Sequence, residues 1–134
     1  MSPSTISSES RELLTSLRNL LLEQHKLLLD RERDSYEKVS GQIPGPGQYL
    51  NLVLNDPHFQ WLKEISTLVV EIDEALSRRS TAGQPVADAL ADQAREVMRP
   101  RETGTAFQAR YYQAVQESPD VVILQCRIED LLRR

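Results

Sequence analysis

The sequence has a single cysteine, Cys126, so it cannot form an intrachain disulfide. That pattern is typical of proteins kept in a reducing compartment. Without a disulfide, a chain of 134 residues depends on an apolar core, and this length suits one domain that can bury one. We therefore expect a single domain over residues 1–134, in which residues 1–7 form a disordered N-terminus.

Long apolar runs are also missing. The longest are Leu20–Leu22, Leu27–Leu29 and Val121–Leu124, whereas a helix that spans a bilayer needs about 20 apolar residues. The first ten residues lack a basic segment followed by an apolar one, so the sequence predicts no signal peptide. These absences favour a cytoplasmic protein without a membrane partner.

An excess of positive charge is missing as well. The chain carries 16 Lys and Arg against 20 Asp and Glu, which gives a net charge of −4 at pH 7. A mildly acidic chain has no general attraction for nucleic acid or anionic lipid. The basic pairs Arg78–Arg79 and Arg133–Arg134 fall near expected helix C-termini, where they complement the helix dipole. We expect no nucleic-acid partner.

Known catalytic and cofactor motifs are absent. The two histidines, His25 and His58, belong neither to the Glu-x-x-His pairs of di-metal bundles nor to a His-Glu-x-x-His zinc site. The segment from Gly41 to Gly47 is rich in glycine but lacks the Gly-x-x-x-x-Gly-Lys pattern of a phosphate-binding loop. Cys126 has no base in a recognisable pattern to activate it. The sequence therefore predicts no catalytic residue, no metal site and no cofactor.

What the sequence does contain is helical apolar spacing between breaks of glycine and proline, with no strand-like alternation. Serine, threonine or aspartate precedes several of these segments as an N-cap. Four of the expected helices cover residues 8–40, with Ser8 as the N-cap, 47–54, 57–78, with Asp56 as the N-cap, and 85–98. Two further helices are expected after the capping box of Thr105 and Gln108 and after the N-cap Ser118. The predicted fold is all-α: a helical bundle with one long N-terminal helix, a second helix of about 20 residues and several short helices.

The first expected helix is apolar over a wide arc. One face carries Leu14, Leu21, Leu22, Leu28, Leu29, Tyr36 and Val39, and a second patch carries Leu13, Leu17, Leu20 and Leu27. A helix with so wide an apolar surface needs several partners, from the same chain or from a second copy. The sequence therefore predicts a homodimer or another protein partner, with two-fold pairing through this helix as the simplest arrangement. In the helix over residues 85–98, Val86 is also expected to face inward.

Arg18, His25 and Glu32 interrupt this apolar face at intervals of seven, so they lie on one line along the helix, two turns apart. Buried charges are costly unless they are paired, so something must satisfy them. One interpretation is a small polar site in which His25 is a ligand or base and Glu32 its carboxylate partner. His58 or Glu64 then forms the opposite wall. The favoured interpretation is structural: His25 hydrogen-bonds a neighbouring helix, while Arg18 and Glu32 either extend their charged ends to solvent or pair at the edge of the core.

Three segments of the chain together carry a resemblance to other proteins. They are Leu54–Glu74, which contains Asn-Asp-Pro-His-Phe-Gln-Trp-Leu, the His-Lys-x-Leu-Leu-x-x-Glu sequence of His25–Glu32, and Ser-Pro-Asp-Val-Val at Ser118–Val122. Through these segments the chain resembles a family of small bacterial proteins of unknown function. The resemblance covers most of the chain. It implies a bacterial source and an all-α fold, and it transfers no catalytic residue.

These observations favour a non-enzymatic helical-bundle protein that acts through protein–protein interaction or self-association. The alternative is a small-molecule or metal-binding helical bundle, with or without enzymatic activity. Its polar site would comprise Arg18, His25, Glu32 and His58. Nucleic-acid binding through a helix-turn-helix is disfavoured, because the chain is acidic and lacks a basic recognition helix.

Overall fold

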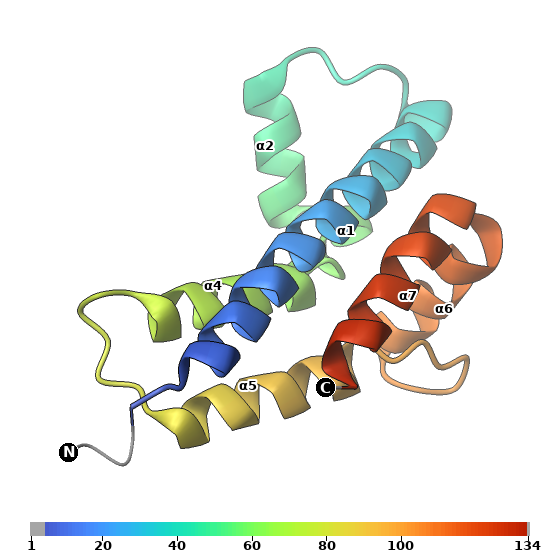
Figure 1. Cartoon of the computed structure of the whole chain (residues 1–134). Coiled ribbons are helices and arrows are strands. Elements are labelled where there is room, and N and C mark those ends of the chain that lie inside the picture. Colours follow the sequence, from blue (N-terminus) through green and yellow to red (C-terminus); the bar gives the residue numbers. More distant parts are fainter. Residues whose placement is uncertain (1–4, 134) are drawn as a thin grey trace.

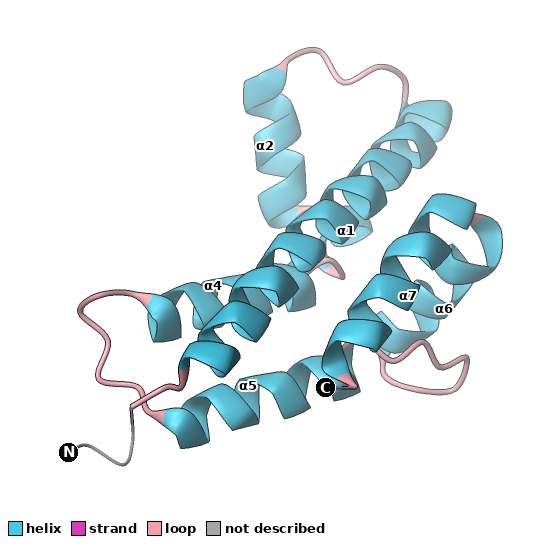
Figure 2. Cartoon of the chain, in the orientation of Figure 1, coloured by secondary structure: helices cyan, strands magenta, loops and turns pink. Residues whose placement is uncertain are grey.

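The computed structural model describes residues 5–133, which form α-helices and no strand (Figure 1 and Figure 2). The helices are α1 (Ser8–Ser40), α2 (Pro46–Asn55), α3 (Pro57–Gln60), α4 (Lys63–Leu76), α5 (Gln84–Val97), α6 (Ala106–Glu117) and α7 (Pro119–Leu132). This architecture confirms the predicted all-α bundle with a long N-terminal helix. No helix within residues 5–133 has the length and apolar character needed to cross a bilayer.

Helix α1 is the central element. It packs against α4 on one side and α7 on the other, and α5 crosses near its N-terminal end (Figure 1). Helix α6 packs against α7, and α2 makes its main contacts with the short helix α3. The short helices are therefore arranged around the long one, while α2 stands away from the centre (Figure 1).

The core follows a heptad-like stripe on α1. Leu14, Leu17, Leu21 and Leu28 are fully buried, and each contributes about 1.5–3 kcal/mol through its burial. The buried side chains of the same cluster on other elements include Ile65, Leu68 and Ile72 of α4, Ala94 of α5, Met98, Tyr111 of α6, and Val121 and Ile128 of α7. Much of the apolar surface of α1 is thus covered by its own chain.

The start of α1 differs from the prediction by one residue. Its N-cap is Ser7, whose hydroxyl accepts a hydrogen bond from the amide of Ser10 at 3.1 Å, and not Ser8. The residue before the cap, Ile6, is only 3% exposed and belongs to the core. The predicted disorder of residues 1–7 therefore does not extend to Ile6 and Ser7, and residues 1–4 lie outside the described part of the chain. The other predicted caps are confirmed at Asp56, Thr105 and Ser118.

The single helix predicted over residues 57–78 is wrong, because the segment is divided into α3 and α4. Across the break, the amide of Leu62 bonds the carbonyl of Phe59, and the amide of Ile65 bonds the carbonyl of Leu62, each at 3.1 Å. Such i→i+3 bonds tighten the chain relative to an α-helix. Phe59 and Leu62 are both buried on the two sides of this turn.

Three apolar side chains are exposed: Val86, which was expected to face inward, and Leu22 and Val39 of the apolar face predicted on α1. Val39 is 87% exposed because it lies in the last turn of α1, beyond the helices that flank its middle (Figure 1). Leu22 stays at the edge of the core, since two flanking helices cannot cover so wide an apolar arc. Val86 lies in the first turn of α5, at the end of that helix away from α7 (Figure 1).

Candidate functional site

The three polar residues of α1 each meet a polar partner on the α3–α4 segment. The pairs are Arg18 with Asp73, His25 with Ser66, and Glu32 with His58. As the residue numbers rise by seven on α1, those of the partners fall by seven and then eight, which is the pattern of antiparallel helices. We call these six residues the polar seam. It joins α1 to α3 and α4 along the edge of the core.

His25 lies in the middle of the polar seam. Its Nε2 atom is 3.2 Å from the hydroxyl of Ser66 on α4. Burial lowers the pKa of His25 below its ordinary value of 6.5, so the ring is neutral at pH 7. A neutral imidazole beside a serine hydroxyl is the beginning of a nucleophile–base pair.

Acyl-transfer chemistry also needs amide donors for the developing oxyanion. The amide of Ser66 itself is engaged inside the helix, where it bonds the carbonyl of Leu62 at 3.5 Å. The contact between His25 and Ser66 therefore joins two helices and does not by itself form a catalytic centre.

Glu32 and His58 meet where α3 begins. Nε2 of His58 lies 2.9 Å from Oε2 of Glu32, although the contact is not a well-directed hydrogen bond. The His58 ring meets Tyr36 edge-on, with centroids 5.7 Å apart, and Phe59 at 5.4 Å. Asp56 holds the backbone of His58 by accepting its amide hydrogen bond at 2.8 Å. Of the two residues expected opposite this part of α1, His58 and Glu64, it is His58 that contacts Glu32, and the contact attaches α3 to the C-terminal half of α1.

The four predicted site residues do not converge on one cavity. His25 lines a groove between α2 and α4, whereas Glu32 lines a separate cleft between α1 and α6. Arg18 pairs with Asp73 where both side chains are partly exposed. Within residues 5–133 no group of three or more His, Cys, Asp or Glu side chains is placed to share a metal ion. The polar seam is a row of separate pairs.

The groove beside His25 is the largest of the openings described here, with a volume of about 670 Å³, and we call it the α2–α4 groove. Its walls are Val53 and Leu54 of α2, Phe59 and Gln60 of α3, Leu62, and Lys63, Ser66, Thr67, Val70, Glu71 and Glu74 of α4. Two of the apolar wall residues remain open to solvent, since Leu54 is 63% and Val70 54% exposed. Leu50, one helical turn before Leu54, is 59% exposed. Among residues 5–133, three of the seven exposed large apolar side chains therefore lie in or next to this groove.

The cleft beside Glu32 has a different character. It measures about 490 Å³, and its polar lining includes Arg31, Lys38 and Glu117. The guanidinium of Arg110 lies 5.7 Å from the centre of the Trp61 ring, which closes one side. Positive and negative side chains are mixed along the cleft. Its charges therefore favour no ligand of one sign.

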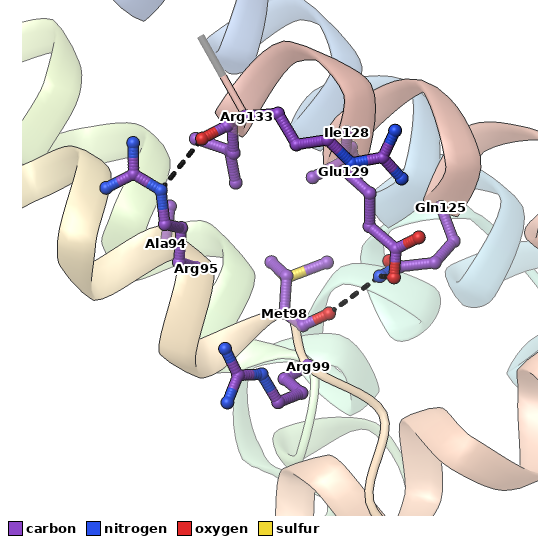
Figure 3. A pocket seen from close by; sticks show the side chains of 9 residues that line it. Ala94, Arg95, Met98, Arg99, Gln125, Ile128, Glu129 and Arg133 are labelled. Carbon is purple, nitrogen blue, oxygen red and sulfur yellow. Dashed lines mark hydrogen bonds between the residues drawn. The ribbon is translucent and has the colours of Figure 1, made fainter.

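A third opening, of about 340 Å³, lies between the C-terminal ends of α5 and α7 (Figure 3). Here each helix end is capped by a side chain of the other. Arg95 donates from Nε to the carbonyl of Leu132 at 2.8 Å, and Gln125 donates from Nε2 to the carbonyl of Met98 at 3.0 Å (Figure 3). These bonds satisfy carbonyls that a helix end leaves without a partner. The polar side chains here serve to lock the two helices together.

Sequence reasoning missed a buried polar network in the centre of the bundle. Gln24 donates from Nε2 to the hydroxyl of Tyr111 at 2.8 Å and to the carbonyl of Val121 at 3.0 Å. The hydroxyl of Tyr111 in turn donates to Oε1 of Gln125. Burial raises the pKa of Tyr111 well above its usual value, so the hydroxyl stays protonated. A signal was present, because Gln24 occupies the core position between Leu21 and Leu28.

Comparison of the chain with protein-family models, with curated protein sequences and with solved structures gave no match. The resemblance to a family of small bacterial proteins therefore stays a prediction. The fold and the site geometry define an all-α bundle whose internal polar residues join its helices. Its most prominent surface feature is the solvent-exposed apolar side chains at the α2–α4 groove.

Proposed function

We propose that this protein is a non-enzymatic interaction module that binds another protein through the α2–α4 groove. The observation that carries the proposal is the exposure of α2, none of whose residues is buried. Of its five large apolar or aromatic side chains, Leu50 and Leu54 are exposed, whereas Tyr49, Leu52 and Val53 are half-buried. Exposed apolar surface that gathers in one place usually marks a contact site.

The shape of the groove supports a protein partner. Residues of α1, α2, α3 and α4 line it, and it is open to solvent. Grooves of this kind accept an amphipathic helix, whose side chains at i, i+3, i+4 and i+7 enter between the walls. The dimer predicted through α1 has less support, because Leu14, Leu17, Leu21 and Leu28 are covered within the chain.

The alternative of a polar ligand site has weaker support as well. His25 and Glu32 face separate openings, and each already contacts a polar partner. No single opening therefore lets one ligand contact both residues.

The test is the native size of the protein in cell extract, measured by size-exclusion chromatography with immunodetection. We expect the wild type to elute well above the size of a 15.3 kDa monomer. Leu54→Asp places a charge in the groove and should return the protein to monomer size. Ile123→Asp is the matched control, because Ile123 is 52% exposed, against 63% for Leu54, and lies on α7 outside the groove.

A wild type that elutes as a monomer in extract, or a Leu54→Asp variant that elutes with the wild type, would contradict the proposed function. Circular dichroism of both variants checks that the helices are intact. Leu54 is exposed, so its replacement should leave the fold of the monomer unchanged.

A further inference from the structure

We infer that the protein seated on the α2–α4 groove is a second copy of this chain, with the two α4 helices antiparallel across a two-fold axis. The inference rests on the proposed function and names the partner for that surface. It follows from the order of charges along the outer face of α4.

Four residues form a stripe on that face: Lys63, Thr67, Val70 and Glu74. Their spacing of four, three and four residues places them on one side of a helix. All four are exposed, and all four line the α2–α4 groove. The stripe is therefore the surface that α4 offers to whatever enters the groove.

The stripe is complementary to itself. In a two-fold interface every contact occurs twice: if residue A of one copy touches residue B of the other, then residue B of the first copy touches residue A of the second. With the axis between Thr67 and Val70, an antiparallel α4 pair sets Lys63 against the partner's Glu74. The same contact then occurs twice, and Thr67 faces the partner's Val70. A parallel pair would instead bring two lysines together at one end and two glutamates at the other.

The charged ends of the stripe form no ion pair with the part of the chain that the structure describes. None of the ion pairs among residues 5–133 involves Lys63 or Glu74. Charged groups at the rim of an interface select partner and orientation more than they add affinity. Lys63 and Glu74 are therefore free to fix the direction of a second helix.

The apolar residues of the groove fit the same arrangement. Val70 lies beside the axis, where the two copies of α4 come closest. Leu54 stands on the α2 wall of the groove and would be covered by the incoming helix. Association of two copies would thus bury the apolar residues whose exposure carries the proposed function.

Charge also distinguishes a second copy from a basic helix of another protein. A strongly acidic groove would favour a basic partner. Here Glu71 and Glu74 are offset by Lys63 in the same wall, with the lysine at one end and a glutamate at the other. This polarity favours a partner with the reverse order, and a reversed copy of α4 supplies it.

The experiment measures the dimer dissociation constant of purified protein by light scattering and sedimentation. Lys63→Glu and Glu74→Lys are made singly and together. Each single change replaces two attractions by two repulsions across the axis, so we expect each to weaken the dimer about tenfold or more at low salt. The double variant restores opposite charges at both contacts and should return within about threefold of the wild type. Lys38→Glu makes the same charge change on α1, outside the groove, and should leave the constant within about twofold.

The outcomes separate the two proposals. A purified wild type that is monomeric at high micromolar concentration overturns the proposal that the partner is a second copy of this chain. If the extract still shows a larger complex that Leu54→Asp disrupts, the proposed function stands with a different partner. A wild-type dimer that the double variant fails to restore overturns the antiparallel α4 arrangement. Restoration by the double variant, with both single variants weakened, supports it.

Discussion

At the scale of single residues, the interior is specified by a few polar side chains set among apolar ones. Gln24 and Tyr111 are fully buried and Gln125 nearly so, and they link α1, α6 and α7 through hydrogen bonds. A buried polar group costs free energy unless it finds a partner, so a shifted packing of these helices would leave amides and a hydroxyl unsatisfied. The network therefore favours one register of α1 against α7.

Tyr111→Phe tests this network directly. The variant keeps the ring in the core and removes the hydroxyl that accepts from Gln24 and donates to Gln125. We expect the free energy of unfolding to fall by about 1–3 kcal/mol, because two buried amide groups lose a partner. Urea unfolding followed by circular dichroism measures the change.

The neighbouring Tyr112→Phe is the matched control. Tyr112 is only half-buried, and its hydroxyl makes no hydrogen bond to residues 5–133. Its loss should change the free energy of unfolding by less than about 0.5 kcal/mol. Equal effects of the two substitutions would show that the network does not stabilise the fold.

His25 gives the stability a dependence on pH. Its pKa in the folded protein lies below 6.5 because burial disfavours the charged ring. As the pH falls through 6.5, the unfolded chain binds a proton before the folded one does, so acidification destabilises the fold. We expect His25→Gln, which can still bond Ser66, to lose less stability between about pH 7 and pH 5 than the wild type. Urea unfolding across that range checks this, and identical pH profiles would contradict it.

Residue positions in the polar seam were only partly predictable. The interval of seven placed Arg18, His25 and Glu32 on one line of α1, and the cap at Asp56 placed His58 at a helix start. Of their partners, only His58 was anticipated. Ser66 and Asp73 lie 41 and 55 positions away from His25 and Arg18 in the sequence. Nothing in the local sequence around this serine or this aspartate indicates such a contact. Their role depends on how α4 crosses α1.

At the scale of elements, helix boundaries follow from capping chemistry because each helix start leaves amides without partners. Most predicted starts were confirmed, and the largest error was the continuous helix over residues 57–78. The apolar spacing continues through the turn between α3 and α4, so periodicity alone gives no sign of it. The turn is decided by the burial of Phe59 and Leu62 against other parts of the chain.

The start of α1 offers a test at this scale. Ser7 provides the side-chain oxygen that accepts from the amide of Ser10, whereas Ser8 is the first residue of the helix and exposed. Ser7→Ala should lower the free energy of unfolding by about 0.5–2 kcal/mol. Ser8→Ala should change it by less than about 0.5 kcal/mol. Thermal unfolding of both variants in one buffer measures the contrast, and a larger effect at Ser8 would refute the assigned cap.

At the scale of the whole molecule, a groove-mediated dimer links stability to concentration. Association stabilises the folded chain by mass action, since the unfolded chain has no groove. We expect the thermal midpoint of the wild type to rise by about 2–4 °C for each tenfold increase in concentration above the dissociation constant. Differential scanning fluorimetry over a concentration series provides the measurement. The midpoint of Lys63→Glu should begin to rise only at about tenfold higher concentration than that of the wild type. A flat series for the wild type would count against self-association.

The sequence by itself determined the all-α class, the long N-terminal helix and most of the caps. These features depend on contacts between residues close in sequence. The local order of apolar residues, capping residues and helix breakers such as glycine and proline is enough to predict them. Only the tertiary structure decided that α1 is covered mainly by its own chain, that α2 is left exposed, and that Gln24 meets Tyr111. Those outcomes depend on crossing angles and on side chains brought together from distant positions, which local periodicity does not specify.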